Sequence, residues 1–236
     1  MFKPSNFSQS WVTKQVYEPN FMIKIIRIAI FLFSFFTSIC FSIAQTLDSL
    51  FAKAEYGSKI KDVQLLMRID SIDYYRVSFL PKHLKKQTYL MFYTKEYWKG
   101  KVVKSDTLFT TEMAKEYLSL KDVDSTKNLS LLTKPKGDSI TFHYNLLGLE
   151  FKKNYKRKHN DQYSLRDGLV TNEKFKSIPV NKTLPLFVYS LPYEDPKRPG
   201  YLFYCELTAL GIPPDNWWDK YKIEHYIVVE MNIVSR

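Results

Sequence analysis

Cysteine is scarce in this sequence, which has only Cys40 and Cys205 among its 236 residues. Small exported proteins without a large core are commonly held together by several disulfides, and this chain cannot belong to that class. Glycine, with 7 residues, and proline, with 11, are also few, which argues against low-complexity disorder. The chain must therefore fold around an apolar core.

Short catalytic and cofactor motifs are also missing. The sequence has no G-x-S-x-G turn, no phosphate-binding glycine loop and no dinucleotide fingerprint. None of the histidines has the spacing of a metal site, so we expect no metal and no cofactor; the four are His83, His143, His159 and His225. An enzyme, specifically a hydrolase, would need a site assembled from dispersed residues such as His143, His225 and Glu206.

Charge is absent from residues 28–47, the one long uncharged run of the chain. Two bases, Lys24 and Arg27, precede this run, and its apolar part ends on small residues. A basic start, an apolar middle and a small-x-small end are typical of a secretory signal peptide. We therefore predict a signal peptide at residues 22–44, cleaved between Ala44 and Gln45.

Two other fates of this segment remain open. The uncharged run has 20 residues, which is enough to stay in the bilayer as an uncleaved anchor. Lipidation at Cys40 is disfavoured because the bulky Ile39 precedes it. With the two bases on the cytoplasmic side, each outcome places the rest of the chain outside the cytoplasm: periplasmic, secreted or membrane-anchored.

A conventional signal begins at Met22, so we interpret residues 1–21 as a non-native N-terminal extension. Removal of residues 1–44 takes away four bases and one acid, which changes the formal net charge from +11 to +8. It also leaves Cys205 without a partner for a disulfide. A basic exported protein favours anionic partners, such as lipid headgroups, acidic glycans or acidic proteins, and export excludes nucleic acid.

Residues 45–236 are long enough for one domain with its own core. Successive hairpins without alternating helices exclude a doubly wound parallel sheet, so we predict a single α+β domain, predominantly antiparallel β with few short helices. The predicted helices span residues 47–56 and begin again at Thr111, with one further turn after Asp215. The predicted strands are 63–69, 72–80, 88–94, 102–109, 129–133, 139–146, 184–191, 201–210 and 223–234.

A basic segment is the clearest charge feature of the domain. Five bases and one tyrosine stand out between positions 152 and 158: Lys152, Lys153, Tyr155, Lys156, Arg157 and Lys158. Such a segment suits an anionic lipid surface or an acidic partner, with the tyrosine at the interface. The alternative is a solvated loop, which is the commoner role of a charge run.

Aromatic residues gather in the last quarter of the chain, and Trp217, Trp218 and Tyr221 form the sharpest group. Tryptophan and tyrosine are enriched at interfaces because they combine a large apolar area with one polar group. Adjacent residues in a turn seldom both point inward, so this group is a candidate binding surface. The alternative, which the pattern favours, is that the tryptophans cap the core beneath the final strand.

Taken together, the sequence favours a non-enzymatic exported binding module that contacts an envelope protein or glycan. An immunity-type protein that neutralises a toxin belongs to this class. The alternatives are an envelope hydrolase and a peripheral binder of anionic lipid or lipopolysaccharide. The sequence does not determine the oligomeric state.

Overall fold

The computed structural model describes residues 49–82, 84, 88–120, 126–158, 162–194, 197–204, 206–209 and 211–235. All of them belong to one compact unit, residues 47–236. The predicted signal segment 22–44, its cleavage site and the extension 1–21 lie outside the described residues, as do His83, His159 and Cys205. In the described part of the chain, no helix has the length and apolarity needed to span a membrane.

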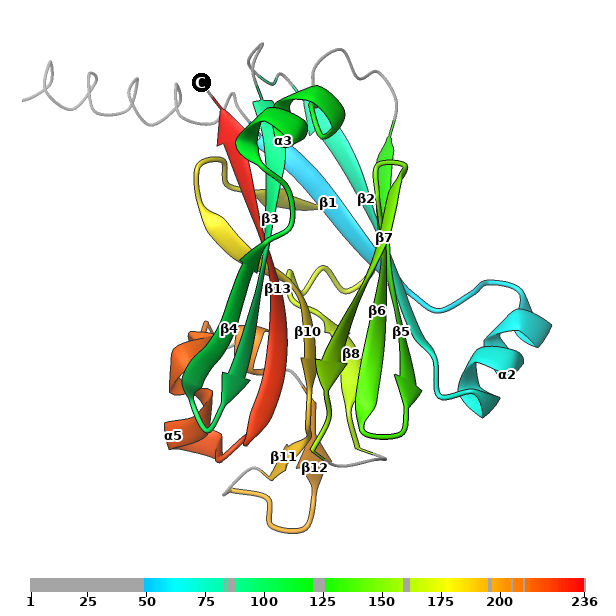
Figure 1. Ribbon diagram of the computed structural model, residues 1–236, viewed down its shortest axis with the longest axis vertical. Helices are drawn as coiled ribbons and strands as arrows, with labels where there is room; N and C mark the ends of the chain where they lie inside the picture. Colours follow the sequence, from blue (N-terminus) through cyan, green and yellow to red (C-terminus); the bar gives the residue numbers. More distant parts are fainter. Residues whose placement is uncertain are drawn as a thin grey trace, which may run out of the picture. The chain divides into compact units, whose positions relative to one another are not determined.

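Two antiparallel sheets form the two layers of this unit (Figure 1). The first sheet has the order β7-β6-β5-β2-β1-β9. Its strands are β1 (Ser49–Tyr56), β2 (Asp73–Lys82), β5 (Lys127–Lys136), β6 (Ser139–Leu146), β7 (Leu149–Lys156) and β9 (Lys176–Ile178). The second sheet has the order β4-β3-β13-β10-β8. Its strands are β3 (Thr88–Trp98), β4 (Lys101–Thr107), β8 (Ser164–Asp167), β10 (Thr183–Ser190) and β13 (His225–Ser235).

Short elements connect and cover the sheets. A small hairpin pairs β11 (Tyr193–Glu194) with β12 (Leu202–Phe203). The helices are α2 (Lys61–Ile69), α3 (Thr111–Tyr117), α4 (Glu206–Ala209), the 3-10 turn η1 (Pro214–Asn216) and α5 (Trp217–Tyr221). The predicted β-rich, antiparallel α+β architecture is thereby confirmed.

Alternating side chains build the main core between the sheets. On β6, Ile140 and Phe142 point inward while their neighbours face out, because successive strand residues lie on opposite faces. On β13, Ile227 and Val229 meet them from the second sheet. Burial of each such side chain stabilises the fold by about 1.5–3 kcal/mol.

The outer face of the second sheet is also covered. Tyr226 and Val228 of β13 point away from the main core, into a second apolar cluster with Leu207 of α4 and Trp217 of α5. The central strand β13 is therefore buried on both faces along most of its length. This explains why residues 226–229 form an uninterrupted apolar run rather than alternating with polar residues.

The structure confirms several predicted elements and corrects others. The hairpin within residues 129–146 is present as β5 and β6, and the helix near Thr111 is present as α3, with the Thr110 hydroxyl accepting from Met113 N at 3.3 Å. The predicted strand 201–210 is instead the short β12 followed by α4.

The two segments around Gly57 are exchanged relative to prediction. Residues 47–56 were expected to be helical, but residues 49–56 form β1. Residues 63–69 were expected to be a strand, but they belong to α2. In β1, Leu50, Ala52 and Ala54 are buried with period two, so sheet pairing overrides a helical spacing that fits the same residues.

Candidate functional site

The basic segment 152–158 does not form one continuous patch. Its residues up to Lys156 lie on the edge strand β7, where they alternate between two faces. Lys152 and Lys156 are exposed on the outer face, whereas Tyr155 is buried in the core. Arg157 and Lys158 follow the strand, and the Lys158 ammonium pairs with Glu224.

Lys153 faces the second sheet and links the two layers. Its ammonium lies 3.0 Å from Asp106 of β4, and Lys104 approaches the same carboxylate at 3.7 Å. The hydrogen bond from Lys153 lowers the pKa of Asp106 below its ordinary value, against a smaller opposing effect of burial. Lys153, which was predicted to contact lipid, therefore forms an ion pair between the two sheets instead.

The two tryptophans occupy different environments. Trp217 is 1% exposed, its indole N–H donates to the Ile212 carbonyl at 3.0 Å, and its ring lies 5.0 Å from that of Tyr226. Trp218 is partly exposed and lies against the turn between β3 and β4, at Gly100. Tyr221 is partly buried, with its ring 4.8 Å from Tyr193. Trp217 thus caps the outer face of the second sheet, and the predicted group shares no single exposed surface.

His225 is fully buried at the start of β13 and takes part in a chain of polar contacts. Its Nε2 lies 3.2 Å from the Glu96 carboxylate, and its Nδ1 lies 2.6 Å from the hydroxyl of Tyr163. Trp98 stacks on the imidazole at 4.0 Å and donates its indole N–H to Glu96 at 3.0 Å. Burial opposes the charged form of Glu96, but the hydrogen bonds from His225 and Trp98 outweigh it and lower its pKa.

Tyr163, His225 and Glu96 are arranged in the order of a nucleophile, a base and a carboxylate that orients the base. However, burial raises the pKa of Tyr163 to about 12, so its hydroxyl stays protonated near neutral pH. The backbone N–H of Lys158 donates to that hydroxyl at 3.2 Å, which leaves the hydroxyl proton for Nδ1 of His225. A neutral imidazole protonated at Nε2 then satisfies each of these contacts.

The dispersed residues proposed for a hydrolase do not come together around His225. His143 lies on the outward side of β6, opposite Lys152 of β7. The side chain of Glu206 lies outside the described residues. Sequence reasoning missed Glu96 and Tyr163, because only the pairing of β13 with β3 brings Glu96 beside His225.

A cleft of about 590 Å³ opens at the end of the sandwich beside Tyr163; we call it the end cleft. Its lining includes Arg157, whose guanidinium lies over the Tyr163 ring at 5.6 Å, and the carboxylates of Asp70 and Asp73. Asp73 accepts hydrogen bonds from the Tyr56 hydroxyl at 2.8 Å and from the Leu165 N–H at 2.9 Å. Among the described residues, no group of three or more metal-ligating side chains occurs here or elsewhere.

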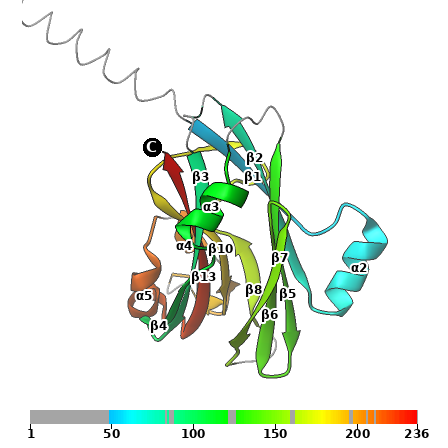
Figure 2. The same cartoon turned by 45° about the horizontal axis from the view of Figure 1, so that its top comes forward.

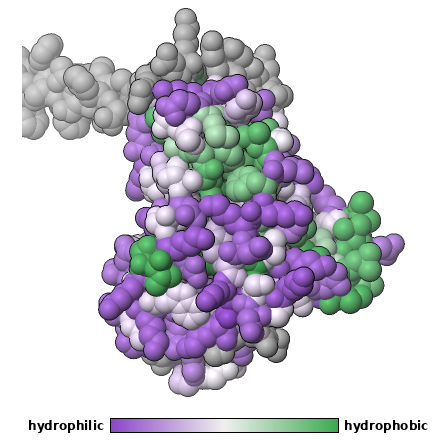
Figure 3. Space-filling model, in the orientation of Figure 1, coloured by the Kyte–Doolittle hydropathy of each residue, from purple (hydrophilic) through white to green (hydrophobic). Residues whose placement is uncertain are grey.

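The most exposed apolar surface belongs to α2, which stands off to one side of the sheets in two views (Figure 1, Figure 2). Five large apolar side chains in and next to this helix are between 41% and 69% exposed: Ile60, Val63, Leu65, Leu66 and Ile69. Only Met67 of the helix is buried. Figure 3 shows apolar surface on the projecting helix, and Ile69 also lines the end cleft.

Comparison with known proteins provides no functional guide: no protein-family model, no curated protein and no solved structure matches this chain.

Proposed function

We propose that this chain is an exported, non-enzymatic binding module of the cell envelope that docks a protein partner through α2. The observation that carries the proposal is the exposure of five large apolar side chains, four in the short helix α2 and the fifth, Ile60, directly before it. Soluble proteins rarely expose contiguous apolar patches of this kind unless the patch is an interaction site. Export rests on the signal-like segment 22–44 of the sequence.

The spacing of the apolar residues in α2 suits a helix that enters a groove. Val63 and Leu66 are three positions apart, and Leu65 and Ile69 are four apart, so neighbouring side chains lie together along the helix surface. Helix-in-groove recognition uses anchors at these spacings. Burying each leucine or isoleucine contributes about 1.5–3 kcal/mol, so a few anchors offset the cost of association.

The charge of the chain points to an acidic partner rather than a second copy. Lys61 and Arg68 lie in α2 with one acid, Asp62, and residues 45–236 carry a formal net charge of +8. Two copies meeting through α2 would bring like charges together, whereas acidic residues around a partner's groove would be complementary.

The basic segment and the aromatic group support other partners less well. Lys153 and Lys158 are already in ion pairs with Asp106 and Glu224, which reduces the charge available for an anionic lipid surface. For a glycan, Trp218 and Tyr221 offer partly exposed rings, but Trp217 does not.

Affinity capture from the envelope of the native host tests the proposal. We expect the wild-type protein to retain a distinct acidic protein that the variant Leu66→Ser/Ile69→Ser does not retain. The matched control is Val102→Ser/Val103→Ser, which changes two exposed apolar residues of β4 and should retain the partner. Equal capture by all three proteins, or no specific capture by wild type, contradicts docking through α2. Circular dichroism and thermal melting establish that the variants are folded.

A further inference from the structure

A second hollow, of about 560 Å³, has no residue of α2 in its lining; we call it the side groove. The loop at 168–170 forms one wall, β9 and the turn that follows it form another, and residues 211–214 close the groove. A volume of this size is typical of sites for small organic ligands.

The apolar residues that line the side groove are aliphatic, and its charged lining residues are all basic. Its apolar lining residues include Leu169, Val170, Leu184, Ile212, Pro213 and Pro214. Among its described lining residues there is no aromatic ring and no carboxylate, but Lys176 and Lys182 are present. This composition differs from that of the end cleft, where Asp70 and Asp73 accompany Arg157.

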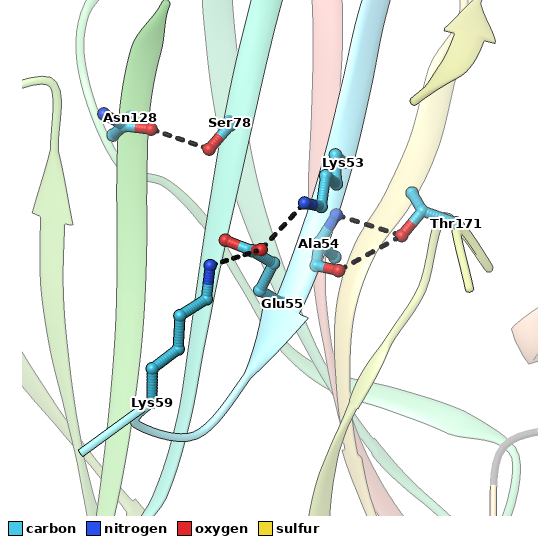
Figure 4. A network of polar contacts seen from close by, with 7 residues as sticks. All are labelled: Lys53, Ala54, Glu55, Lys59, Ser78, Asn128 and Thr171. Atoms are coloured by element: carbon cyan, nitrogen blue, oxygen red, sulfur yellow. Dashed lines mark hydrogen bonds and ion pairs between the residues drawn. The ribbon is translucent and has the colours of Figure 1, made fainter. Parts of the chain in front are cut away.

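Hydrogen bonds fix the 168–170 wall in place. The Asp167 carboxylate accepts from Leu169 N at 2.9 Å, from Thr171 N at 2.7 Å and from the Thr171 hydroxyl at 2.8 Å. The Thr171 hydroxyl oxygen in turn accepts from Ala54 N of β1 at 2.9 Å (Figure 4). The loop is therefore tied to β1, the strand next to the β9 edge of the first sheet.

Two backbone features show that this wall is a defined structure. Val170 has a φ of +52°, a conformation that β-branched residues rarely adopt and that persists only where the surroundings enforce it. At Gly168, an added Cβ would lie 2.8 Å from the backbone of Pro185, so the loop approaches β10 as closely as only glycine permits. Strained, over-determined backbone of this kind concentrates at ligand sites.

We propose that the side groove binds a long-chain fatty acid. The acyl chain lies along the aliphatic lining, and the carboxylate lies at Lys182 and Lys176. Lys176 Nζ donates one N–H to the Leu169 carbonyl at 3.0 Å, and an ammonium group has two further donors. Neither lysine is in an ion pair within the described residues. An aliphatic lining with cations and without acids favours an anionic amphiphile over a neutral or cationic one.

Titration of the purified protein with monomeric oleate, below its aggregation concentration, tests this site. We expect saturable binding of one oleate, with oleyl alcohol binding about tenfold more weakly because it lacks the carboxylate. Lys182→Gln should weaken oleate binding by about tenfold, the loss of one charge-assisted hydrogen bond. Lys152→Gln, an exposed lysine on β7, is the matched control and should leave binding unchanged.

A second variant keeps the test independent of charge. Ile212→Trp places a larger side chain in the groove and should abolish oleate binding while the thermal transition is retained. No saturable binding by wild type, equal affinity for oleate and oleyl alcohol, or equal losses from Lys182→Gln and Lys152→Gln would each overturn the proposal. Binding to anionic phospholipid vesicles without binding to free oleate would likewise overturn it, since it would indicate a headgroup surface.

Discussion

Replacement of Trp217 by alanine is the perturbation whose outcome the structure determines most sharply. The indole is 1% exposed and packs against Tyr226 of β13, with its N–H satisfied by the Ile212 carbonyl. Truncating a buried tryptophan to alanine costs about 3–5 kcal/mol, because apolar burial is lost and a cavity remains. For a unit of this size, the loss lowers the melting temperature by roughly 10 °C.

The adjacent residue provides the matched comparison. Trp218→Ala removes the same side chain from a partly exposed position against Gly100, where solvent fills the space, so we expect a cost of about 1 kcal/mol. Urea unfolding followed by circular dichroism at 222 nm measures both variants on the same scale. Equal losses for Trp217→Ala and Trp218→Ala would refute the assignment of opposite environments to these neighbours.

The burial of Trp217 determines which variant can test the aromatic group as a binding surface. A variant that changes both tryptophans would lose the stability contributed by Trp217, so any lost binding would not report on contact with a partner. Trp218→Ala alone is the appropriate variant, because its packing against the β3–β4 turn is peripheral to the core.

Three further predictions concern turns, charge and the buried histidine. Gly100→Ala should cost about 1–3 kcal/mol more than Gly148→Ala in urea unfolding, because both positions have a positive φ but only at Gly100 does an added Cβ meet a side-chain atom at 2.9 Å. Equal costs would contradict this. Asp106→Asn should lose up to about 1 kcal/mol at pH 7 and progressively less as the pH falls below about 3.9, because a carboxylate with a lowered pKa stabilises the fold above its ordinary pKa and loses that effect as the pH falls through the lowered one. A pH-independent difference from wild type in a melting series would count against the ion pair with Lys153. Tyr163→Phe should cost about 1–3 kcal/mol in urea unfolding, because the buried Nδ1 of His225 then lacks its hydrogen-bond donor. An unchanged unfolding midpoint would exclude that hydrogen bond.

Local patterns in the sequence were sufficient for the strands that alternate or are continuously apolar. The period of two across Ile140, Phe142 and Tyr144 predicted β6, and the apolar run at 88–94 predicted a strand buried on both faces, as β3 is over most of its length. These patterns are set by burial on one or two faces of a sheet, so they can be read without knowledge of the strand partners.

The segments on either side of Gly57, whose helix and strand predictions were reversed, show where prediction from local sequence patterns fails. A short run such as Leu47 to Ala54 fits both periodicities, and pairing with β2 and β9 decides in favour of a strand. In α2, the apolar residues are exposed, so the usual link between apolar pattern and burial does not hold. That same departure is the reason we propose α2 as a docking surface, since local consistency is most often broken at functional sites.

The candidate sites were only partly predictable because their parts are distant in the chain. The sequence distinguished the tryptophan pair but not which member points inward, a choice set by the second core cluster. The basic segment was visible, but strand alternation and the contact of Lys153 with Asp106 divide it between two faces. The side groove depends on the approach of residues 168–170 to 211–214, which no local pattern encodes.

Docking through α2 is the central claim, and site-specific photo-crosslinking in the native host tests it most directly. A photoreactive amino acid replaces Leu66 in one strain and Val103, an exposed apolar residue of β4, in another. We predict that position 66 yields one discrete adduct with an acidic envelope protein, that this adduct disappears when Ile69→Ser is added, and that position 103 does not yield it. The same adduct from both positions, or an adduct at position 66 with the mass of two copies of this chain, would contradict the claim.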